Sequence, residues 1–597
     1  MAKDSVSGRA FDMRILRRIY AFTRPYRSRF ILSVVLTLLL AFISPVRPIL
    51  IQYTIDHYIL KLDEHGLMNM MILMVVLLLI QTAIQYLHTY ITNWLGQIVI
   101  RDLRVKLFRH IANLRLKYFD HTPIGTLVTR TISDLETIAD IFSEGLIVII
   151  GDLLQLFVII AVMFFKDWRL TLISLSTMPI LLVATRIFQY GINKTFREVR
   201  TQVAALNTFV QEHITGMNIV QIFNREEEEM KRFKSINKEH MKANIRSVWY
   251  YSIFFPVVEL LSATSIGLLV WWGSAGVITH DVSLGNVIAF IMFINMLFRP
   301  IRELADKFNT LQMGMVSSER VFKVLDTQEF IADKGTITRP ITGNIRFENV
   351  WFAYNESPIT ENGEPEWVIR DLSFEIKAGE TLALIGATGA GKSSVINLVG
   401  RLYEFQKGNI YIDDINIRDY KLDDLRKQIA VVLQDVFLFS DSVLNNITLN
   451  DQSITRKQVE NAAEAVGADQ FINKLPGKYD FNVMERGAML SVGQRQLLSF
   501  IRAYVFKPSI LVLDEATSSI DSASEELIQE ATARLTSNRT SIVIAHRLAT
   551  IQNANKIIVM SHGKKAEEGN HQELLKQNGL YKELYELQFS GASGTRV

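Results

Sequence analysis

The chain has 597 residues, of which 64 are Lys or Arg and 61 are Asp or Glu, a net charge of +3 that excludes a protein gripping nucleic acid over its whole surface. Hydrophobic residues make up 49% of the chain and charged residues 21%, which excludes global disorder and indicates that some apolar surface faces lipid. There is no cysteine, so disulfides, thiolate metal sites, iron–sulfur clusters and a cysteine nucleophile are excluded as well.

Long apolar runs in the first half of the chain predict six membrane-spanning helices. A spanning helix needs about 20 residues to cross about 30 Å of hydrocarbon. The predicted spans are 30–54, 67–93, 138–165, 168–192, 247–274 and 283–304. No apolar run precedes Phe30, so we expect no cleaved signal peptide.

The distribution of basic residues predicts the orientation of these spans. Residues 1–29 hold eight Lys or Arg and the stretch 101–136 holds seven, whereas the three opposite loops together hold only Lys61, Lys166 and Arg169. Because basic loops stay on the cytoplasmic side, we expect a multi-pass protein of the cell membrane with both termini inside the cell.

The internal connections are long and have helical apolar spacing with mixed charge, so spans two to five should extend beyond the membrane. Gly125 and Gly216 mark their turns, each of which would present a short segment to the domain below. The expected divisions are an N-terminal segment 1–29, a membrane domain 30–304, a linker 305–343, an α/β domain 344–590 and a tail 591–597.

A glycine-rich loop follows the apolar strand predicted at 381–385. In GATGAGKSS, Gly386, Gly391, Lys392 and Ser393 fill the pattern G-x-x-x-x-G-K-[ST]. Its backbone N–H groups can wrap a phosphate, and the next helix points its N-terminal dipole at the same charge. We expect Lys392 to reach the β- and γ-phosphates of ATP and Ser393 to bind Mg²⁺.

Two acids end a second apolar strand, ILVL, at 510–513. They fall at the carboxyl end of the strand, where α/β proteins bind ligands. Asp514 suits Mg²⁺ bound through water, and Glu515 suits the general base for the attacking water.

Three further motifs carry a resemblance to a known family. LSVGQRQLLSFIRA at 490–503, DEATSSID at 514–521 and AHR at 545–547 resemble the ATPase domain of ABC transporters. Six spans ahead of that domain resemble the type IV, multidrug-exporter arrangement. The resemblance therefore implies an all-α six-helix membrane domain followed by an α/β P-loop NTPase domain.

The resemblance also implies roles for individual residues. Those expected to bind the nucleotide are Tyr354, Gly386, Thr388, Gly389, Ala390, Gly391, Lys392, Ser393, Ser394, Ser491, Gly493, Gln494 and Asp521. Those expected in catalysis are Glu515, His546 and Gln434, and those expected to bind Mg²⁺ are Ser393, Gln434 and Asp514. Tyr354 would stack on adenine, although a core aromatic is the alternative. Glu485, Arg486 and Gly487 match the segment that contacts the internal loops.

The signature departs from the family at one position, with Val492 where glycine is usual. The resemblance implies that this signature closes on ATP held by another chain. One ATPase domain per chain then requires a second half-transporter, for which we favour an identical chain and keep a different one as the alternative.

These features predict an ATP-hydrolysing half-transporter that moves amphipathic drugs or lipids out of the cytoplasm or inner leaflet. A nucleotide-gated channel or regulator, or a peptide exporter, is the alternative. The spans exclude a soluble ATPase, a fused permease disfavours an importer, and the lack of cysteine excludes a peptide exporter with its own cysteine protease.

Two acids interrupt the predicted spans, Asp152 in the third and Glu259 in the fifth. A charge in hydrocarbon is costly, so such residues face a bundle interior or a watery cavity. One alternative is that they pair with Arg47 or Arg186, or lie near the interface. The other is that Glu259, and after it Asp152, attracts cationic substrates in the inward-facing cavity.

Overall fold

The computed structural model describes residues 12–143, 145–279, 281–356, 363–514, 522–545 and 547–589. It forms two compact units, each considered by itself. The first comprises 1–112 and 124–327, and the second comprises 113–123 and 328–597.

The described part of the first unit is helical. Its helices are α1 (Met13–Ala21), α2 (Arg27–Ile43), α3 (Val46–Thr54), α4 (Glu64–Ala112), α6 (Ile124–Thr131), α7 (Ser133–Ser143), α8 (Leu146–Lys166), α9 (Trp168–Leu175), α10 (Met178–Thr215), α11 (Met217–Ile222), α12 (Glu226–Ile278) and α13 (Leu284–Asp326), with a 3₁₀ turn at Arg24–Tyr26 and a π turn at Ile55–Ile59. Six stretches are long and apolar enough to cross a membrane, namely Arg24–Ile59, Glu64–Ala112, Ile124–Lys166, Trp168–Thr215, Glu226–Ile278 and Leu284–Ile301. The prediction of six apolar helices is confirmed.

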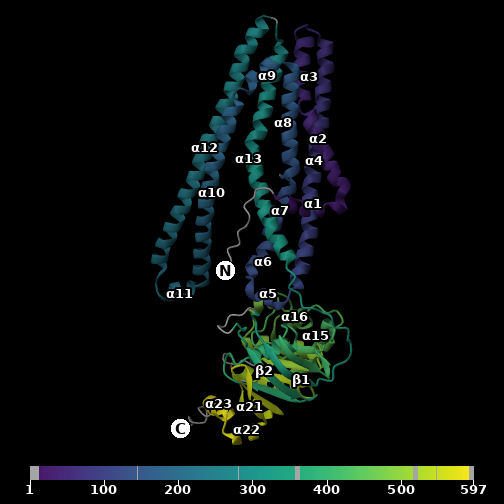
Figure 1. Ribbon diagram of the computed structural model, residues 1–597, viewed down its shortest axis with the longest axis vertical. Coiled ribbons are helices and arrows are strands. Elements are labelled where there is room, and N and C mark those ends of the chain that lie inside the picture. Colours follow the sequence, from purple (N-terminus) through teal and green to yellow (C-terminus); the bar gives the residue numbers. More distant parts are fainter. Residues whose placement is uncertain are drawn as a thin grey trace. The chain divides into compact units, whose positions relative to one another are not determined.

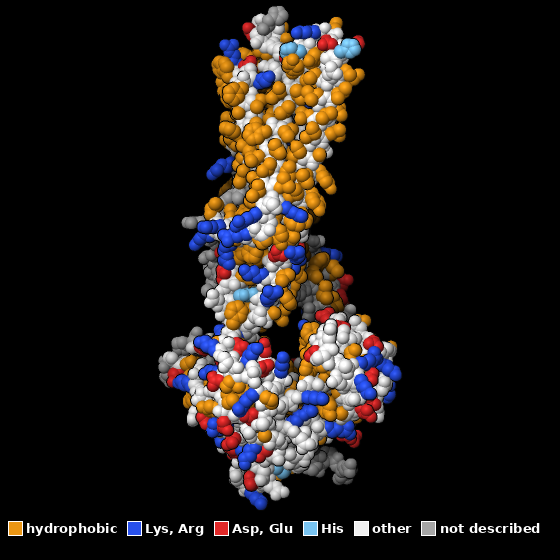
Figure 2. Space-filling view, turned by 90° about the vertical axis from the view of Figure 1, so that its right-hand side faces the viewer, with side chains coloured by type: hydrophobic (Ala, Val, Ile, Leu, Met, Phe, Trp, Pro, Cys, Tyr) orange, Lys and Arg blue, Asp and Glu red, His pale blue; other side chains and the backbone are white. Residues whose placement is uncertain are grey.

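The outer surface of these helices is apolar, as expected for contact with lipid. The most apolar stretch of α4 has no buried residue. Leu79, for example, exposes 64% of its surface, which is unfavourable in water but not in hydrocarbon. Figure 2 shows apolar side chains over most of the visible face of this unit, with Lys and Arg side chains gathered beyond one end.

Two features organise the polar ends of this unit. Helices α10 and α12 lie side by side as a long hairpin with α11 at its turn, immediately after Gly216 (Figure 1). The N-terminal helix α1 is fixed to the end of α13, because both terminal nitrogens of Arg18 donate to the carboxylate of Asp326 at 2.7 Å. The predicted linker 305–343 thus begins inside a helix that runs to Asp326.

The second unit contains two β-sheets. One has four strands in the order β2-β1-β4-β5, with β1 (Ile345–Phe352), β2 (Ile369–Ile376), β4 (Lys407–Ile412) and β5 (Ile415–Asn416), all antiparallel. The other has six in the order β10-β9-β3-β8-β7-β6, with β3 (Thr381–Ile385), β6 (Ile429–Val432), β7 (Ile510–Asp514), β8 (Thr540–Ile544), β9 (Lys556–Ser561) and β10 (Lys564–Gly569). Within the latter, only β10 runs antiparallel to its neighbour.

The central strands are apolar throughout because both faces of the larger sheet are covered. Successive side chains of a strand point to opposite faces. Accordingly Leu382 and Leu384 of β3 lie in a cluster with the smaller sheet, whereas Ala383 lies in a second cluster with the helices on the other face.

The helices of this unit are α5 (Leu116–His121), α14 (Lys392–Val399), α15 (Leu422–Lys427), α16 (Val443–Thr448), α17 (Arg456–Val466), α18 (Asp469–Lys474), α19 (Val492–Val505), α20 (Ser522–Thr536), α21 (Leu548–Asn553), α22 (His571–Gln577) and α23 (Leu580–Phe589), with 3₁₀ turns at Lys478–Asp480 and Glu485–Gly487. Their presence with the parallel sheet confirms the predicted α/β class.

Candidate functional site

The parallel strands bring the predicted catalytic segments to one edge of the larger sheet. The glycine-rich loop begins after β3, Asp514 is the last residue of β7, and Gln434 is the second residue after β6. Strands β3, β8, β7 and β6 are consecutive in the sheet, so these segments leave it at the same, carboxyl edge. This is the edge at which open α/β sheets bind ligands.

Two positions of the loop backbone favour glycine. Gly386 has φ +153° and Gly391 has φ +100°. A Cβ on Gly386 would lie 2.3 Å from the carbonyl oxygen of Met560, and one on Gly391 would lie 3.1 Å from that of Val368. The loop is therefore folded closely against the sheet before α14 begins, which directs its N–H groups outward as a cradle for phosphate.

Lys392 begins α14 and turns back over the loop. Its Nζ donates to the carbonyl oxygens of Gly386 at 2.7 Å and Ala387 at 3.0 Å. Burial lowers the pKa of Lys392, and the nearby carboxylate of Asp514 opposes that shift. The ammonium is thus held between the loop and the end of β7, where it can contact the phosphates of a nucleotide.

The two serines after Lys392 face different surroundings. Ser393 is exposed, so its hydroxyl is open to a metal ion at the mouth of the loop. Ser394 is buried, and its Oγ lies 3.0 Å from the hydroxyl oxygen of Tyr354. Asn397, one turn further along α14, donates to the same tyrosine oxygen at 3.4 Å.

A helix end with its own cap lies elsewhere in the same unit. Ser491 precedes α19; its Oγ accepts from the backbone N–H of Gln494 at 3.2 Å, and its N–H donates to the side-chain oxygen of Gln494 at 3.0 Å. This capping box fixes the serine at a helix N-terminus, an arrangement suited to binding an anion.

Family models and curated relatives agree with this geometry. Residues 30–301 match the model of the ABC transporter transmembrane region, and residues 369–518 match that of the ABC transporter. The chain is 36% identical over 595 residues to the uncharacterized ABC transporter ATP-binding protein YknV of Bacillus subtilis, covering 99% of this chain and 97% of that protein. The chain is an ABC transporter.

Two other relatives suggest what kind. The ATP-dependent lipid A-core flippase of Desulfotalea psychrophila is 33% identical over 580 residues, covering 96% of this chain and 99% of that protein. YgaD of Bacillus subtilis, which has a provisional name as a multidrug export ATP-binding/permease protein, is 33% identical over 586 residues, covering 96% of this chain and all of that protein. The chain is therefore an ABC exporter that couples ATP hydrolysis to transport across a membrane.

Within this transporter, the departure in the ABC signature is tolerated by the fold. Val492 is the first residue of α19 and is 43% exposed, so part of its branched side chain faces outward from its own chain. Gly493 is buried. The side chain of Gln494, predicted to contact nucleotide, is engaged in the capping box.

Several other predicted residues have a described setting. Gln434 is exposed at the carboxyl edge. Tyr354 is half-buried, with its ring edge-on to Phe352 at 4.8 Å and Tyr403 at 5.1 Å between centroids. Three predicted residues, Glu515, Asp521 and His546, lie outside the described part of the chain.

Sequence reasoning did not identify the contacts made by α5 of this ABC exporter. The hydroxyl of Tyr403 donates to Asp120, and Lys117 forms an ion pair with Glu356 at 3.4 Å. Burial and the neighbouring carboxylate raise the pKa of Tyr403. The turn segment before Gly125 is thus bound to the ATPase domain next to the tyrosines that pack on α14.

The membrane domain of the transporter contains a polar cavity of about 600 Å³. It is lined by residues of α2, α3, α4, α8 and α13, whose polar members are Thr37, Ser44, Arg47, Gln81, Gln85, His88, Asp152, Gln155, Asn295, Arg299 and Lys307. Polar side chains are costly at this depth unless they serve a cavity or pathway. The sequence analysis singled out only Asp152 and Arg47 of this set.

The expected partner of Asp152 was wrong. The acid forms its ion pair with Lys307 of α13 at 2.7 Å, rather than with Arg47 or Arg186. Lys307 lies beyond the predicted sixth span, and only the packing of α13 on α8 brings the two together. Glu259 is exposed on α12 and is not among the described residues that line this cavity.

Proposed function

We propose that this ABC exporter works as a pair of half-transporters that moves an amphipathic drug or lipid out of the cytoplasm or inner leaflet. The observation that carries the proposal is the single phosphate loop at the carboxyl edge together with a single capped signature helix. If each signature closes on the loop of another chain, two complete sites require two chains. The printed names of the flippase and the multidrug-export relative support an amphipathic substrate.

The charge distribution supports the proposed orientation of the chain in the membrane. The excess of Lys and Arg in 1–29 and 101–136 supports cytoplasmic termini and a cytoplasmic ATPase domain in the cell membrane. ATP would then be bound and hydrolysed on the side from which the substrate leaves.

The chemistry of the donors fits Mg²⁺-ATP. Ser393, Gln434 and Asp514 offer hydroxyl, amide and carboxylate oxygens, which are the ligands that Mg²⁺ prefers. Lys392 would neutralise the phosphates, Glu515 would accept a proton from the attacking water, and His546 would contact the γ-phosphate. Tyr354 is proposed to stack on adenine; its fixed hydroxyl beside α14 supports that position.

The polar cavity of the membrane domain is the proposed contact for the polar part of the substrate. Its described lining has three strongly basic side chains, Arg47, Arg299 and Lys307, against the single acid Asp152, which already pairs with Lys307. Arg47, which has no ion-pair partner among the described side chains, favours neutral or anionic head groups over cations at this cavity. Asp152 already pairs with Lys307, which argues against the cation preference considered for it.

A native mass measurement on the purified protein, combined with a screen for compounds that stimulate its ATPase activity, tests the proposal. We expect a mass of two chains and stimulation by amphipathic compounds or lipids. A protein that stays monomeric and hydrolyses ATP at full rate would contradict the pairing. A monomer without ATPase activity that forms a two-chain complex and hydrolyses ATP only with a different chain would replace the identical partner by a heterodimer. Val492 would then close on the phosphate loop of a chain that has its own, different signature.

A further inference from the structure

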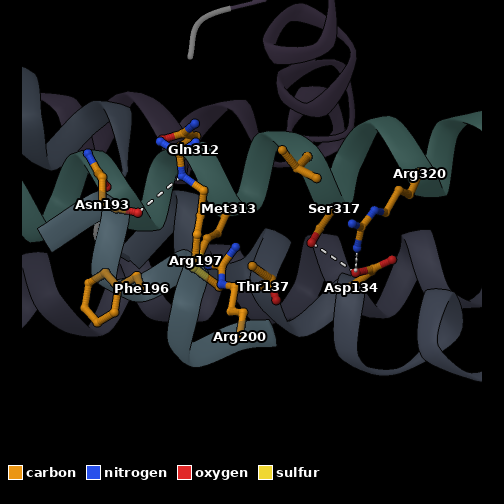
Figure 3. A pocket seen from close by; sticks show the side chains of 11 residues that line it. Asp134, Thr137, Asn193, Phe196, Arg197, Arg200, Gln312, Met313, Ser317 and Arg320 are labelled. Carbon is orange, nitrogen blue, oxygen red and sulfur yellow. Dashed lines mark hydrogen bonds and ion pairs between the residues drawn. The ribbon is translucent and has the colours of Figure 1, made fainter. Parts of the chain in front are cut away.

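A second cavity, of about 560 Å³, lies between α7, α10 and α13 of the membrane domain (Figure 3). It is lined by Asp134, Thr137, Asn193, Phe196, Arg197, Arg200, Gln312, Met313, Val316, Ser317 and Arg320. Gln312 follows the apolar stretch Leu284–Ile301 by eleven residues of continuous helix, roughly 16 Å at 1.5 Å per residue. The cavity is therefore outside the hydrocarbon, where water and charged solutes can enter.

The one acid in the described lining is already neutralised. Asp134 is buried; its Oδ2 accepts from the guanidinium of Arg130 at 2.6 Å, and its Oδ1 accepts from the hydroxyl of Ser317 at 3.1 Å. Arg320 approaches the same carboxylate at the longer distance of 3.7 Å. The strong pair with Arg130 leaves the charge of Arg320 largely uncompensated.

Two more guanidinium groups enter from α10. Arg197 and Arg200 are one turn apart on that helix, and Figure 3 shows both among the side chains of the cavity, with Arg320 and Ser317 at the end where Asp134 lies. The Nε of Arg197 donates only to the backbone oxygen of Asn193 at 3.3 Å. Among the described side chains, neither Arg197 nor Arg200 has an ion-pair partner.

Three arginines line one cavity, and their nearest acid, Asp134, pairs mainly with a fourth, so an anion in the cavity would relieve their mutual repulsion. Guanidinium forks match phosphate oxygens in pairs, and a phosphate group has up to two negative charges where a carboxylate has one. Asn193, Gln312 and Thr137 add neutral hydrogen-bonding groups to the lining.

We propose that this arginine cavity binds a phosphate-bearing anion, either the head group of a lipid or a soluble phosphate. The site is separate in the chain from the nucleotide loop and does not depend on the direction of export. Arg197, Arg200 and Arg320 would contact the phosphate oxygens.

The test uses the full chain in nanodiscs, with Lys392→Ala in every protein to weaken phosphate binding at the nucleotide loop. The cavity variant is Arg197→Gln/Arg200→Gln. The matched control, Lys194→Gln/Lys234→Gln, removes the same charge from exposed positions of α10 and α12 that do not line the cavity. One arm titrates inorganic pyrophosphate into phosphatidylcholine nanodiscs by calorimetry. The other compares hydrogen exchange at 193–200 and 312–320 in phosphatidylcholine nanodiscs with and without phosphatidylglycerol.

Two results would support the site and identify its source. Pyrophosphate affinity that falls at least about tenfold in the cavity variant, but not in the control, assigns a soluble phosphate, because charge-assisted hydrogen bonds contribute about that much. Protection by phosphatidylglycerol that is lost only in the cavity variant assigns a lipid head group.

Equal behaviour of the cavity variant and the control in both arms would overturn the proposal. The proposal would also be overturned if these segments were protected from hydrogen exchange whenever a second chain is bound, with or without a phosphate. The arginines would then contact the second chain. The apparent unfolding temperature of both variants is measured alongside, to show that each is folded.

Discussion

Separating Asp152 from Lys307 should reveal how strongly the membrane domain depends on this ion pair. The charged atoms are 2.7 Å apart, and the side chains keep only 20% and 16% of their surfaces exposed. At an effective dielectric constant of about 20 the attraction is about 6 kcal/mol. The desolvation of two charges offsets most of it, which leaves a net coupling of about 1–3 kcal/mol.

The assay is a double-mutant cycle on the purified protein in nanodiscs. Asp152→Asn and Lys307→Met should each lower the apparent unfolding temperature by several degrees, because each leaves the opposite charge without its main partner. The double variant should lose clearly less than the sum of the two. Lys234→Met, on an exposed part of α12, is the control for removal of a lysine and should change little.

Scans at a single heating rate, followed by tryptophan fluorescence, make the variants comparable even if unfolding is irreversible. If the temperature shifts of the two single variants add up to the shift of the double variant, the pair contributes no coupling and our interpretation of the cavity is wrong.

Three further changes probe the ATPase domain. Lys392→Ala should lower ATP hydrolysis at least about 100-fold, because it removes the buried ammonium from the phosphate loop; unchanged turnover in a steady-state assay would refute its role. Gly386→Ala should abolish nucleotide binding measured by calorimetry, since its Cβ would lie 2.3 Å from a backbone oxygen, whereas Gly400→Ala, whose Cβ meets nothing closer than 3.7 Å, should bind normally. Burial alone would raise the pKa of Asp413, but hydrogen bonds from residues 342–344 outweigh it and lower that pKa. A lowered pKa gives stability that is present above the ordinary carboxyl pKa and lost as pH falls through the folded value. Asp413→Asn should therefore lower the unfolding temperature at pH 7 and reduce its dependence on acid pH, and a wild-type-like acid profile in the variant would contradict this.

The architecture could be predicted from the sequence because its signals are local. A spanning helix requires an uninterrupted apolar run, which is visible in the sequence. A phosphate loop requires glycines at fixed spacing before a lysine, so the motif from Gly386 to Ser393 can be recognised from the sequence alone. The strand order was not predicted; the structure shows that the parallel strands β3, β6 and β7 place Gly386, Gln434 and Asp514 at one edge.

The cavities could not be predicted, because their residues are distant in the chain. Asp152 and Lys307 are 155 positions apart, and nothing in either segment specifies the other. In the sequence, the arginines of the second cavity have the spacing of any solvent-exposed helix face. Only the packing of α7, α10 and α13 shows that they line one cavity. Capping gives Gln494 a local role that the resemblance did not include: its side chain bonds with Ser491, and its contact with nucleotide stays a prediction.

The most direct test of the account is uptake into inside-out proteoliposomes of a compound that stimulates the ATPase activity. The wild-type protein should accumulate the compound above its external concentration with Mg²⁺-ATP, and should not do so with a non-hydrolysable analogue. Glu515→Gln should bind ATP with near-normal affinity yet show neither hydrolysis nor accumulation, because the amide cannot accept the proton of the attacking water. The contrary result is a flux that needs only ATP binding, is equal in the wild type and Glu515→Gln, and stops when the compound has equilibrated. That result would contradict ATP-driven export and establish a nucleotide-gated channel.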